Sequence, residues 1–254
     1  MKMLLTVEFD GGRYRGWQAQ KNLPTVQRVL TNCALNTYGE KCLITGCSRT
    51  DSGVHATGYK CTLEFADKNS ERDISSVIPA ETLPDALNAR LYHDDISVID
   101  AEVVDDDFHP RYMAKSKTYE YYFYTRRRSP FLAKYVYVSG KIDDGMLDRM
   151  NAAAAGFIGT HDFSAFMSSG SSVADTERTI FECRLERRGD FVVLIVRGDG
   201  FLYNMVRIMA GTIYGCGRGR FEPEDIPNII KSRDRQQAGE TFPPNALFLT
   251  HVEY

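Results

Sequence analysis

The sequence predicts an α+β fold in which helices pack against mainly antiparallel sheets. Segments of alternating apolar and polar residues, typical of half-buried strands, are mixed with segments whose apolar residues recur at helical spacing. In the second half, strand-like segments at 179–187 and 191–197 flank Arg188-Gly189-Asp190, which indicates an antiparallel hairpin.

The length and composition allow one large domain or two smaller ones. The chain has 254 residues, 43% of them hydrophobic and 26% charged, as in an ordinary soluble globular protein. We expect an N-terminal α+β lobe over residues 1–104 and a C-terminal α+β lobe over residues 105–254. No sequence-identical repeat relates the two halves.

Several functional classes are not expected. No apolar run approaches membrane-spanning length, and residues 1–5 pass directly into a strand pattern instead of forming a signal peptide. The six cysteines form no Cys-x-x-Cys pair and no cluster with histidine, so we expect buried thiols in the cytoplasm and no zinc. The chain has no P-loop and no dinucleotide fingerprint, and we expect neither a cofactor nor a metal.

The first half is predicted to alternate between strands and helices. Residues 3–9 indicate a strand, and Thr25 is a potential N-cap for a helix with Val26 and Leu30 on its apolar side. Residues 67–82 are polar and rich in helix-breaking residues, so we expect a loop there. The remaining elements of this half are strands over 61–65 and 96–104 and a helix over 84–91.

The second half shows the same mixture. A strand is predicted over 119–125, with Tyr119 and Tyr121 on one face. Residues 159–166 are expected to form a turn, and residues 168–178, rich in serine and glycine, to be mobile. The remaining elements are helices over 144–157, 201–214 and 224–230 and a strand over 247–252.

A glycine-rich loop from Gly46 to Gly58 carries the most suggestive side chains. Arg49 and Asp51 are two residues apart, so in an extended segment they point to the same face. A neighbouring cation keeps a carboxylate ionised, which prepares an oxygen nucleophile or an electrostatic stabiliser. The alternative is an Asx-turn with a surface ion pair, because most isolated Arg-x-Asp pairs are structural. His55 follows closely in the same loop.

Arg207 is the only charge in a helix that is apolar nearly all round. Such a helix is expected to be largely buried, and a buried arginine without a carboxylate or phosphate partner costs several kcal/mol. Either Arg207 reaches water along its own stem, or it meets an acid from another segment. Asp51 is the acid that we would choose.

Charge is segregated along the chain, although the net charge is only −3. Residues 94–107 contain seven acids and no base, whereas residues 111–128 contain six bases and one acid. Residues 184–220 contain seven arginines and three acids. Such segregation can build a basic surface for a polyanion on an acidic protein, or merely solvated faces that never meet.

The glycine-rich loop closely resembles the catalytic signature of the tRNA pseudouridine synthases of the TruA family, Gly-x-Gly-Arg-Thr-Asp-Ala-Gly-Val-His-Ala. Ser48 and Ser52 depart from it by replacing a glycine and an alanine. Ala246 likewise replaces a glycine in a C-terminal block. Further blocks similar to the family are a Tyr-x-Gly-Trp-Gln-x-Gln segment at 14–20, Phe-His-x-Arg at 108–111, Tyr-x-Tyr at 119–121 and the arginine block at 201–207.

The resemblance implies a homodimer of two similar lobes with an active-site cleft between them. It implies that the protein binds tRNA and isomerises uridine to pseudouridine at positions 38 to 40 of the anticodon stem-loop. Asp51 is then the catalytic aspartate, Arg207 its partner, and Tyr119 the residue that packs on the target base. The RNA-contacting residues implied are Tyr119, Arg49, His55, Phe108 and Arg111.

Two rival functions come from other classes. The departures at Ser48, Ser52 and Ala246 fit a catalytically silent RNA-binding paralogue. A nucleosidase that cleaves the base without reattaching it is the other alternative. An assay with tritium at uracil C5 of unmodified tRNA separates the three functions. Tritium release with the base retained indicates a synthase, free uracil indicates a nucleosidase, and binding without release indicates a silent binder.

Overall fold

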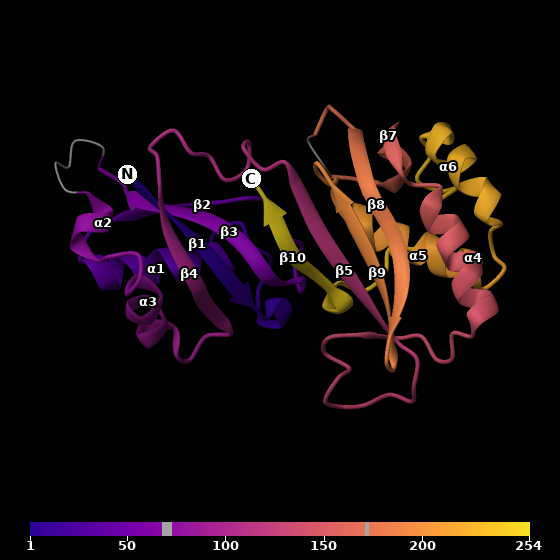
Figure 1. The fold of residues 1–254 in the computed structure, drawn as a ribbon, viewed down its shortest axis with the longest axis horizontal. Helices are drawn as coiled ribbons and strands as arrows, with labels where there is room; N and C mark the ends of the chain where they lie inside the picture. Colours follow the sequence, from indigo (N-terminus) through magenta and orange to yellow (C-terminus); the bar gives the residue numbers. More distant parts are fainter. Residues whose placement is uncertain (68–72, 171–172) are drawn as a thin grey trace. The chain divides into compact units, whose positions relative to one another are not determined.

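The computed structural model describes residues 1–67, 73–170 and 173–254 and has the expected α+β class. The chain forms two compact units. Unit 1 contains Met1–Lys115 together with the C-terminal Leu249–Tyr254, and unit 2 contains Ser116–Phe248. In Figure 1 the helices of each unit lie beside the strands of the same unit.

The sheet of unit 1 is built around β1 (Lys2–Phe9), which pairs antiparallel with β3 (His55–Phe65) and with β4 (Ile96–Val104). The strand order is β4-β1-β3-β10, where β10 covers Leu247–Glu253. The short strand β2 (Cys42–Gly46) pairs with β3. The chain segment between β2 and β3 is therefore fixed at both ends by one antiparallel pair, and this segment carries Arg49 and Asp51.

The first helix of unit 1, α1 (Val26–Tyr38), begins directly after Thr25, as predicted. The Thr25 side chain makes no capping hydrogen bond, and the helix ends at Gly39 in the left-handed conformation. The helix α3 (Leu83–Leu91) matches its predicted range. Both helices contact each other, and they pack on β2 and β4 respectively.

The prediction of a loop over 67–82 is wrong in part. A single-turn helix, α2 (Ile74–Val77), forms there because the Asp73 carboxylate accepts the Ser75 backbone N–H and caps its first turn. Residues 68–72 of that prediction lie outside the described residues, as do residues 171–172 of the segment expected to be mobile.

The sheet of unit 2 contains the predicted hairpin. Strands β8 (Glu177–Arg188) and β9 (Phe191–Gly198) are antiparallel, and Gly189 turns between them with φ +59°. Strand β5 (Ser116–Tyr124) pairs with β9, and the order is β5-β9-β8-β7. Two short strands complete it: β6 (Tyr137–Val138), parallel to β5, and β7 (Gly159–Asp162), antiparallel to β8.

The turn predicted over 159–166 is therefore wrong. Its first residues form β7, because Thr160 and His161 pair with Thr179 and Arg178 of β8, and its last residues form the 3-10 helix η2 (Ser164–Phe166). Strand pairing with a distant segment decides this region, and local turn residues do not reveal such a partner.

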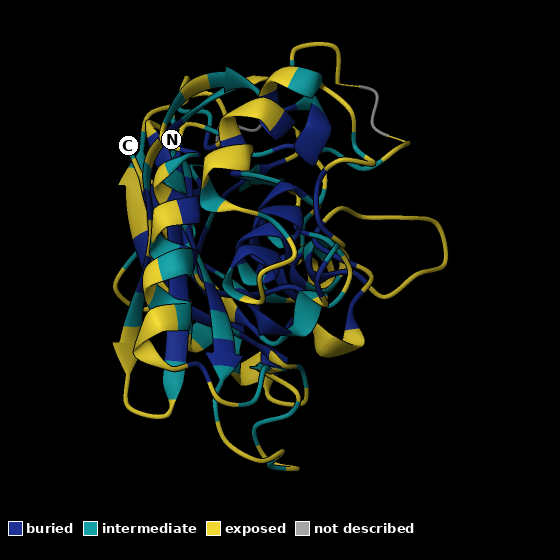
Figure 2. Ribbon diagram, turned by 90° about the vertical axis from the view of Figure 1, so that its right-hand side faces the viewer, coloured by how far each residue is buried: buried dark blue, intermediate teal, exposed yellow. Residues whose placement is uncertain are grey.

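Three helices belong to unit 2: α4 (Asp144–Ala155), α5 (Met205–Gly217) and α6 (Ile226–Ser232). As predicted, α5 is largely buried, with only Arg207, Tyr214 and Gly217 partly accessible. It begins four residues later than predicted, because Asn204 is in the left-handed conformation with φ +62°. Figure 2 shows the contrast between helices buried along their length and surface helices with one exposed side.

Aromatic side chains form much of the core of unit 2. Tyr121 and Phe123 of β5 meet Phe242, with ring centroids 6.1 and 6.3 Å away, and Tyr137 lies 4.4 Å from Phe242. Aromatic pairs contribute about 0.5–1.5 kcal/mol each beyond the area they bury. None of the helices within the described ranges is long and apolar enough to span a membrane.

Candidate functional site

The loop that carries Arg49 and Asp51 is held by the segment that follows β1. The Trp17 backbone N–H donates to the Thr50 carbonyl at 3.4 Å, and the Ser52 hydroxyl donates to the Tyr14 carbonyl at 3.2 Å. Within the loop, the Val54 N–H donates to the Asp51 carbonyl at 3.2 Å, which closes a tight turn. The backbone on both sides of Asp51 is thus fixed by hydrogen bonds.

Glycines of the neighbouring segment allow this close approach. Gly16 has φ +83°, and a Cβ there would lie 2.4 Å from the Thr50 carbonyl oxygen. A Cβ on Gly11 would lie 1.9 Å from the Val54 carbonyl oxygen. Distances below 3.0 Å are not tolerated by backbone, so any side chain at either position would displace the loop around Asp51.

Trp17 supports the loop from below and is not available to a base. It is only 1% exposed and stacks on Tyr59 with ring centroids 4.0 Å apart. The Tyr59 hydroxyl donates to the Ser48 carbonyl. Trp17 is therefore an anchor of the core of unit 1.

The two charged residues of the loop differ in accessibility. Arg49 is exposed, whereas Asp51 is half-buried. A half-buried carboxylate on a rigid loop can react with a substrate that reaches it, and an exposed guanidinium nearby can contact a polyanion. The loop therefore presents both groups that the sequence singled out.

His55 lies behind the loop and not on its surface. It is 1% exposed, and its Nδ1 accepts the Gly11 backbone N–H at 3.1 Å. Asp10 Oδ1 lies 3.0 Å from the same nitrogen. His55 thus fixes the backbone of the neighbouring segment, and its ring has no accessible surface for RNA.

The predicted Phe-His-x-Arg block forms a compact turn. His109 Nδ1 accepts the backbone N–H groups of Arg111 and Tyr112 at 3.2 and 3.4 Å. The Phe108 ring packs 4.9 Å from that of Tyr254. Arg111 is exposed, with its guanidinium carbon 5.8 Å from the centre of the Tyr112 ring.

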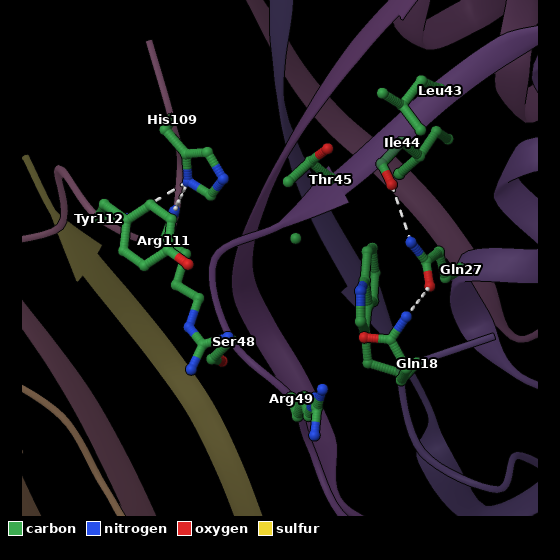
Figure 3. A pocket seen from close by; sticks show the side chains of 12 residues that line it. Gln18, Gln27, Leu43, Ile44, Thr45, Ser48, Arg49, His109, Arg111 and Tyr112 are labelled. Atoms are coloured by element: carbon green, nitrogen blue, oxygen red, sulfur yellow. Dashed lines mark hydrogen bonds between the residues drawn. The ribbon is translucent and has the colours of Figure 1, made fainter. Parts of the chain in front are cut away.

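This turn and the Asp51 loop line one hollow of unit 1. Its volume is about 240 Å³, and Arg49 and Arg111 are both among its walls. Figure 3 shows these side chains around the hollow, with Gln18 and Gln27 on the opposite wall from His109. The structure thus brings together Arg49 and Arg111, which are 62 positions apart in the sequence.

In unit 2, Arg207 is half-buried and held by polar groups of its own unit. Its Nε donates to the Phe242 carbonyl at 2.7 Å, and its Nη1 donates to the Asn204 side chain. Asn204 in turn donates to the Ser168 hydroxyl at 2.9 Å. The guanidinium is therefore fixed in one orientation. Sequence reasoning missed Asn204, although an asparagine directly before an apolar helix is a known start signal.

Tyr119 and Tyr121 share the buried face of β5, as predicted. Tyr119 is 6% exposed and meets Phe201 edge to face at 5.1 Å. Tyr121 is fully buried and donates its hydroxyl to the Pro243 carbonyl at 3.0 Å. Burial raises the pKa of Tyr121, which keeps that phenol neutral and structural.

The arginines of residues 184–220 are mostly paired with acids on the same sheet. Arg184 contacts Glu182 and Glu186, and Arg188 contacts Glu186 and Glu120. The pKa of Glu186 is lowered by hydrogen bonds from these two arginines. Ion pairs within β8, and one from β8 to Glu120 of β5, therefore neutralise much of the local excess of positive charge that the sequence shows. Arg187 pairs with Asp144 of α4, and Arg197 of β9 pairs with Glu182 of β8.

The arginines of residues 111–128 are more available. Arg126 pairs with Asp190 at 2.8 Å, whereas Arg127 and Arg128 are exposed and receive no ion pair from the part of the chain that the structure describes. These two and Arg111 are the better candidates for contacts with phosphates.

Within residues 1–67, 73–170 and 173–254, no group of three or more His, Cys, Asp or Glu side chains could hold a metal ion. All six cysteines are free and buried. Burial raises the pKa of Cys42 and of Cys216 to about 11, so both thiols stay protonated and unreactive near neutral pH.

Comparison with known proteins decides the family. The chain is 44% identical over 254 residues to tRNA pseudouridine synthase A of Caldicellulosiruptor saccharolyticus, which covers 99% of both chains. The chain belongs to the tRNA pseudouridine synthase A family. The enzyme of that name from Acetivibrio thermocellus is 43% identical, with 98% of both chains covered.

The family described as tRNA pseudouridine synthase also matches residues 153–254, a range that includes Arg207. Among solved structures, the chain is similar to one in a crystal structure of a Cbf5-Nop10-Gar1 complex, at 10% identity and a TM-score of 0.39. That match covers 97% of this chain and 48% of the other.

The departures from the family signature fit the backbone. Among the described residues, the only non-glycine residues with positive φ are Asn22, Asn204 and Arg233. Ser48, Ser52 and Ala246 therefore occupy conformations that any residue can adopt, and none of the three sites needs glycine for its φ. Ala246 is fully buried and Ser52 bonds the Tyr14 carbonyl, so both residues are accommodated.

Proposed function

We propose that the protein is a tRNA pseudouridine synthase that isomerises uridine at positions 38 to 40 of the anticodon stem-loop. One observation carries the proposal: a relative 44% identical over nearly its whole length bears the name tRNA pseudouridine synthase A. The rigid loop with a half-buried aspartate, Asp51, supports it. No observation favours a silent binding protein or a nucleosidase.

The reaction breaks the bond between uracil N1 and the ribose C1′, turns the base, and joins C5 to C1′. The proton on C5 leaves and N1 gains one, so substrate and product are isomers. Asp51 is the residue proposed to attack the sugar or to stabilise the positive charge that develops on it. Its fixed backbone holds the carboxylate in place without reorganisation during the reaction.

Other residues are proposed to act on the same uridine. Arg207 supplies a guanidinium whose direction is set by Phe242 and Asn204, as an electrostatic partner of the catalytic carboxylate requires. Tyr119 packs on the target base through its ring. A paired uridine is unreachable, so it must be flipped out of the helix. The exposed Arg49 guides the uridine out or fills the gap that it leaves between the stacked bases.

Phe108 and Arg111 are proposed to contact the RNA around this site, with Arg111 at a phosphate. His55 supports the loop from within and reaches the RNA only through the backbone that it holds. We further propose a cytoplasmic homodimer. Sedimentation equilibrium of the purified protein would show a mass near twice 28.7 kDa.

The decisive assay uses unmodified tRNA with tritium at uracil C5. Tritium in water with the base retained on the RNA supports the proposal. Free uracil would indicate a nucleosidase, and RNA binding without release would indicate a silent binder; either result contradicts it. Replacing the uridines at 38, 39 and 40 by cytidine, one at a time, should each remove part of the tritium release. Unchanged release from the triple replacement would contradict the assigned positions.

A further inference from the structure

The residues that line the hollow of unit 1 favour a small, negatively charged part of a larger ligand. Two guanidinium side chains, Arg49 and Arg111, contribute to its walls, and no acid does so among the described residues. Its volume of about 240 Å³ is below the ~300–1,000 Å³ of pockets that hold drug-sized ligands. It therefore suits a fragment of a polymer, such as a base or a phosphate, better than a complete small-molecule substrate.

One wall presents a fixed hydrogen-bond acceptor. The backbone N–H of Ala19 donates to Gln27 Oε1 at 2.8 Å, and Gln27 Nε2 donates to the Ile44 carbonyl at 2.8 Å. Because a backbone N–H only donates and a carbonyl only accepts, the orientation of the Gln27 amide is determined. Gln18 lies 3.1 Å from the same Oε1, so it must donate its own Nε2.

The amide oxygen of Gln18 is thereby left facing away from Gln27. Figure 3 shows it directed toward the open space between Gln18 and Ser48. An acceptor held in this way is suited to an N–H group on the edge of a nucleic-acid base.

The opposite wall offers a surface for stacking. Tyr112 is 77% exposed, although its ring is held 4.3 Å from His109 and its backbone N–H is bound by that histidine. An exposed aromatic ring on an ordered turn is a typical platform for an unstacked base, and an adjacent arginine adds attraction to the phosphate. Arg111 supplies that cation next to Tyr112.

We propose that this hollow binds a second unstacked nucleotide of the tRNA, distinct from the uridine that reacts. Its base edge meets the Gln18 amide oxygen, its ring stacks on Tyr112, and its phosphate lies at Arg111. Asp51 is not among the residues that line the hollow, and we place the reacting sugar at Asp51, outside the hollow. Arg49 belongs both to the loop of Asp51 and to the hollow, and it links the two positions. This proposal rests on the proposed action on tRNA.

The chain carries a built-in reporter for the test. Trp17 is its single tryptophan and lines the hollow. A base bound against the other walls changes the surroundings of this buried ring without stacking on it, so the Trp17 fluorescence should change. Wild-type protein is titrated with unmodified tRNA, and binding is measured in parallel by filter retention and by tryptophan fluorescence. We expect both signals to saturate at the same RNA concentration.

Variants assign the signal to the hollow. Arg111→Gln should raise the Kd about tenfold and reduce the steepness of the log Kd against log salt plot by about 1, as loss of one phosphate contact does. Gln18→Ala should raise the Kd by about threefold to tenfold and weaken the fluorescence change. Arg90→Gln is the matched control, because Arg90 is exposed on α3 of the same unit and donates to the Ala86 carbonyl of its own helix at 3.1 Å.

The outcomes separate this proposal from the proposed function. Pseudouridine formation and RNA retention with unchanged Trp17 fluorescence would overturn the second-nucleotide site and leave the function intact. Equal behaviour of Arg111→Gln and Arg90→Gln would overturn it as well. A protein that retains no tRNA on the filter would contradict both.

Discussion

Replacing Gly16 by alanine should damage the Asp51 loop from outside it. Gly16 has φ +83°, and a Cβ would lie 2.4 Å from the Thr50 carbonyl oxygen and 3.3 Å from the Asp51 carbonyl carbon. A left-handed alanine costs about 1–2 kcal/mol in itself. Relief of the clash requires movement of backbone, and overpacking of this kind costs a further ~1–3 kcal/mol.

Gly39 provides a matched control. Its φ is +70°, but no atom lies within 4 Å of the position that a Cβ would occupy. Gly39→Ala should therefore lose only the conformational part, about 1–2 kcal/mol of unfolding free energy. Gly16→Ala should lose about 1–3 kcal/mol more. Its single-turnover rate should also fall by roughly tenfold to a hundredfold, since a displacement near 1 Å at a catalytic group has effects of that size.

Urea unfolding gives the stabilities, and tritium release at saturating tRNA gives the rates. Gly39→Ala should keep the wild-type rate. If Gly16→Ala matched Gly39→Ala in both unfolding free energy and rate, the contact between the Gly16 segment and the Asp51 loop would not shape the site.

Three further predictions concern unit 2. Arg207→Lys should fold and bind tRNA but lose at least about a hundredfold in single-turnover rate, near 2.7 kcal/mol, because lysine cannot keep both the Phe242 and Asn204 bonds. Neutralising Arg127 and Arg128 together should reduce the slope of the log Kd against log salt plot for tRNA by about 2. Arg184→Gln should change this slope little, because Arg184 is already ion-paired. Burial opposes the ionisation of Asp162, but hydrogen bonds from Thr176 and Ser164 outweigh it and lower its pKa. Its contribution to stability is therefore complete above the ordinary aspartate pKa and lost as the pH falls through the lowered value.

Each of these has a control and a contrary result. Arg220→Lys, at an exposed arginine of unit 2, should keep the wild-type rate. If Arg207→Lys were equally active, the planar guanidinium group of Arg207 would not be required for the reaction. A salt slope that responded to Arg184 as strongly as to Arg127 and Arg128 would place the RNA on the ion-paired sheet. For Asp162→Asn, urea midpoints between pH 3 and 7 should show a smaller loss on acidification than in the wild type. Asp148→Asn on α4 should behave like the wild type.

The sequence predicted the elements whose signal is local. The alternation in β1, the hairpin of β8 and β9 and the apolar length of α5 are patterns within one segment, and all three are confirmed. The strand β7 was missed because its stability comes from pairing with β8 and not from its own residues. The helix α2 was missed because one cap, Asp73, outweighs a polar composition.

For the site, too, local sequence patterns were predictive and contacts between distant segments were not. The residue types in the Asp51 loop indicated chemistry, since glycines, an arginine and an aspartate occur together there. The sequence could not show that Gly11 and Gly16 make room for that loop, or that Trp17 is buried beneath it. Nor could it show that Gln18 is aligned by Gln27, because such contacts depend on which segments meet in space.

The most direct test of the account is the rate of the Asp51→Asn variant. The change removes the charge of one half-buried carboxylate and leaves the backbone bonds of the loop in place. Tritium release from C5-labelled tRNA is measured in single turnover, and tRNA affinity is measured on filters in parallel. We expect no detectable release, with affinity within about tenfold of wild type, roughly 1.4 kcal/mol. A variant that retained a tenth of the wild-type release would contradict the catalytic role of Asp51.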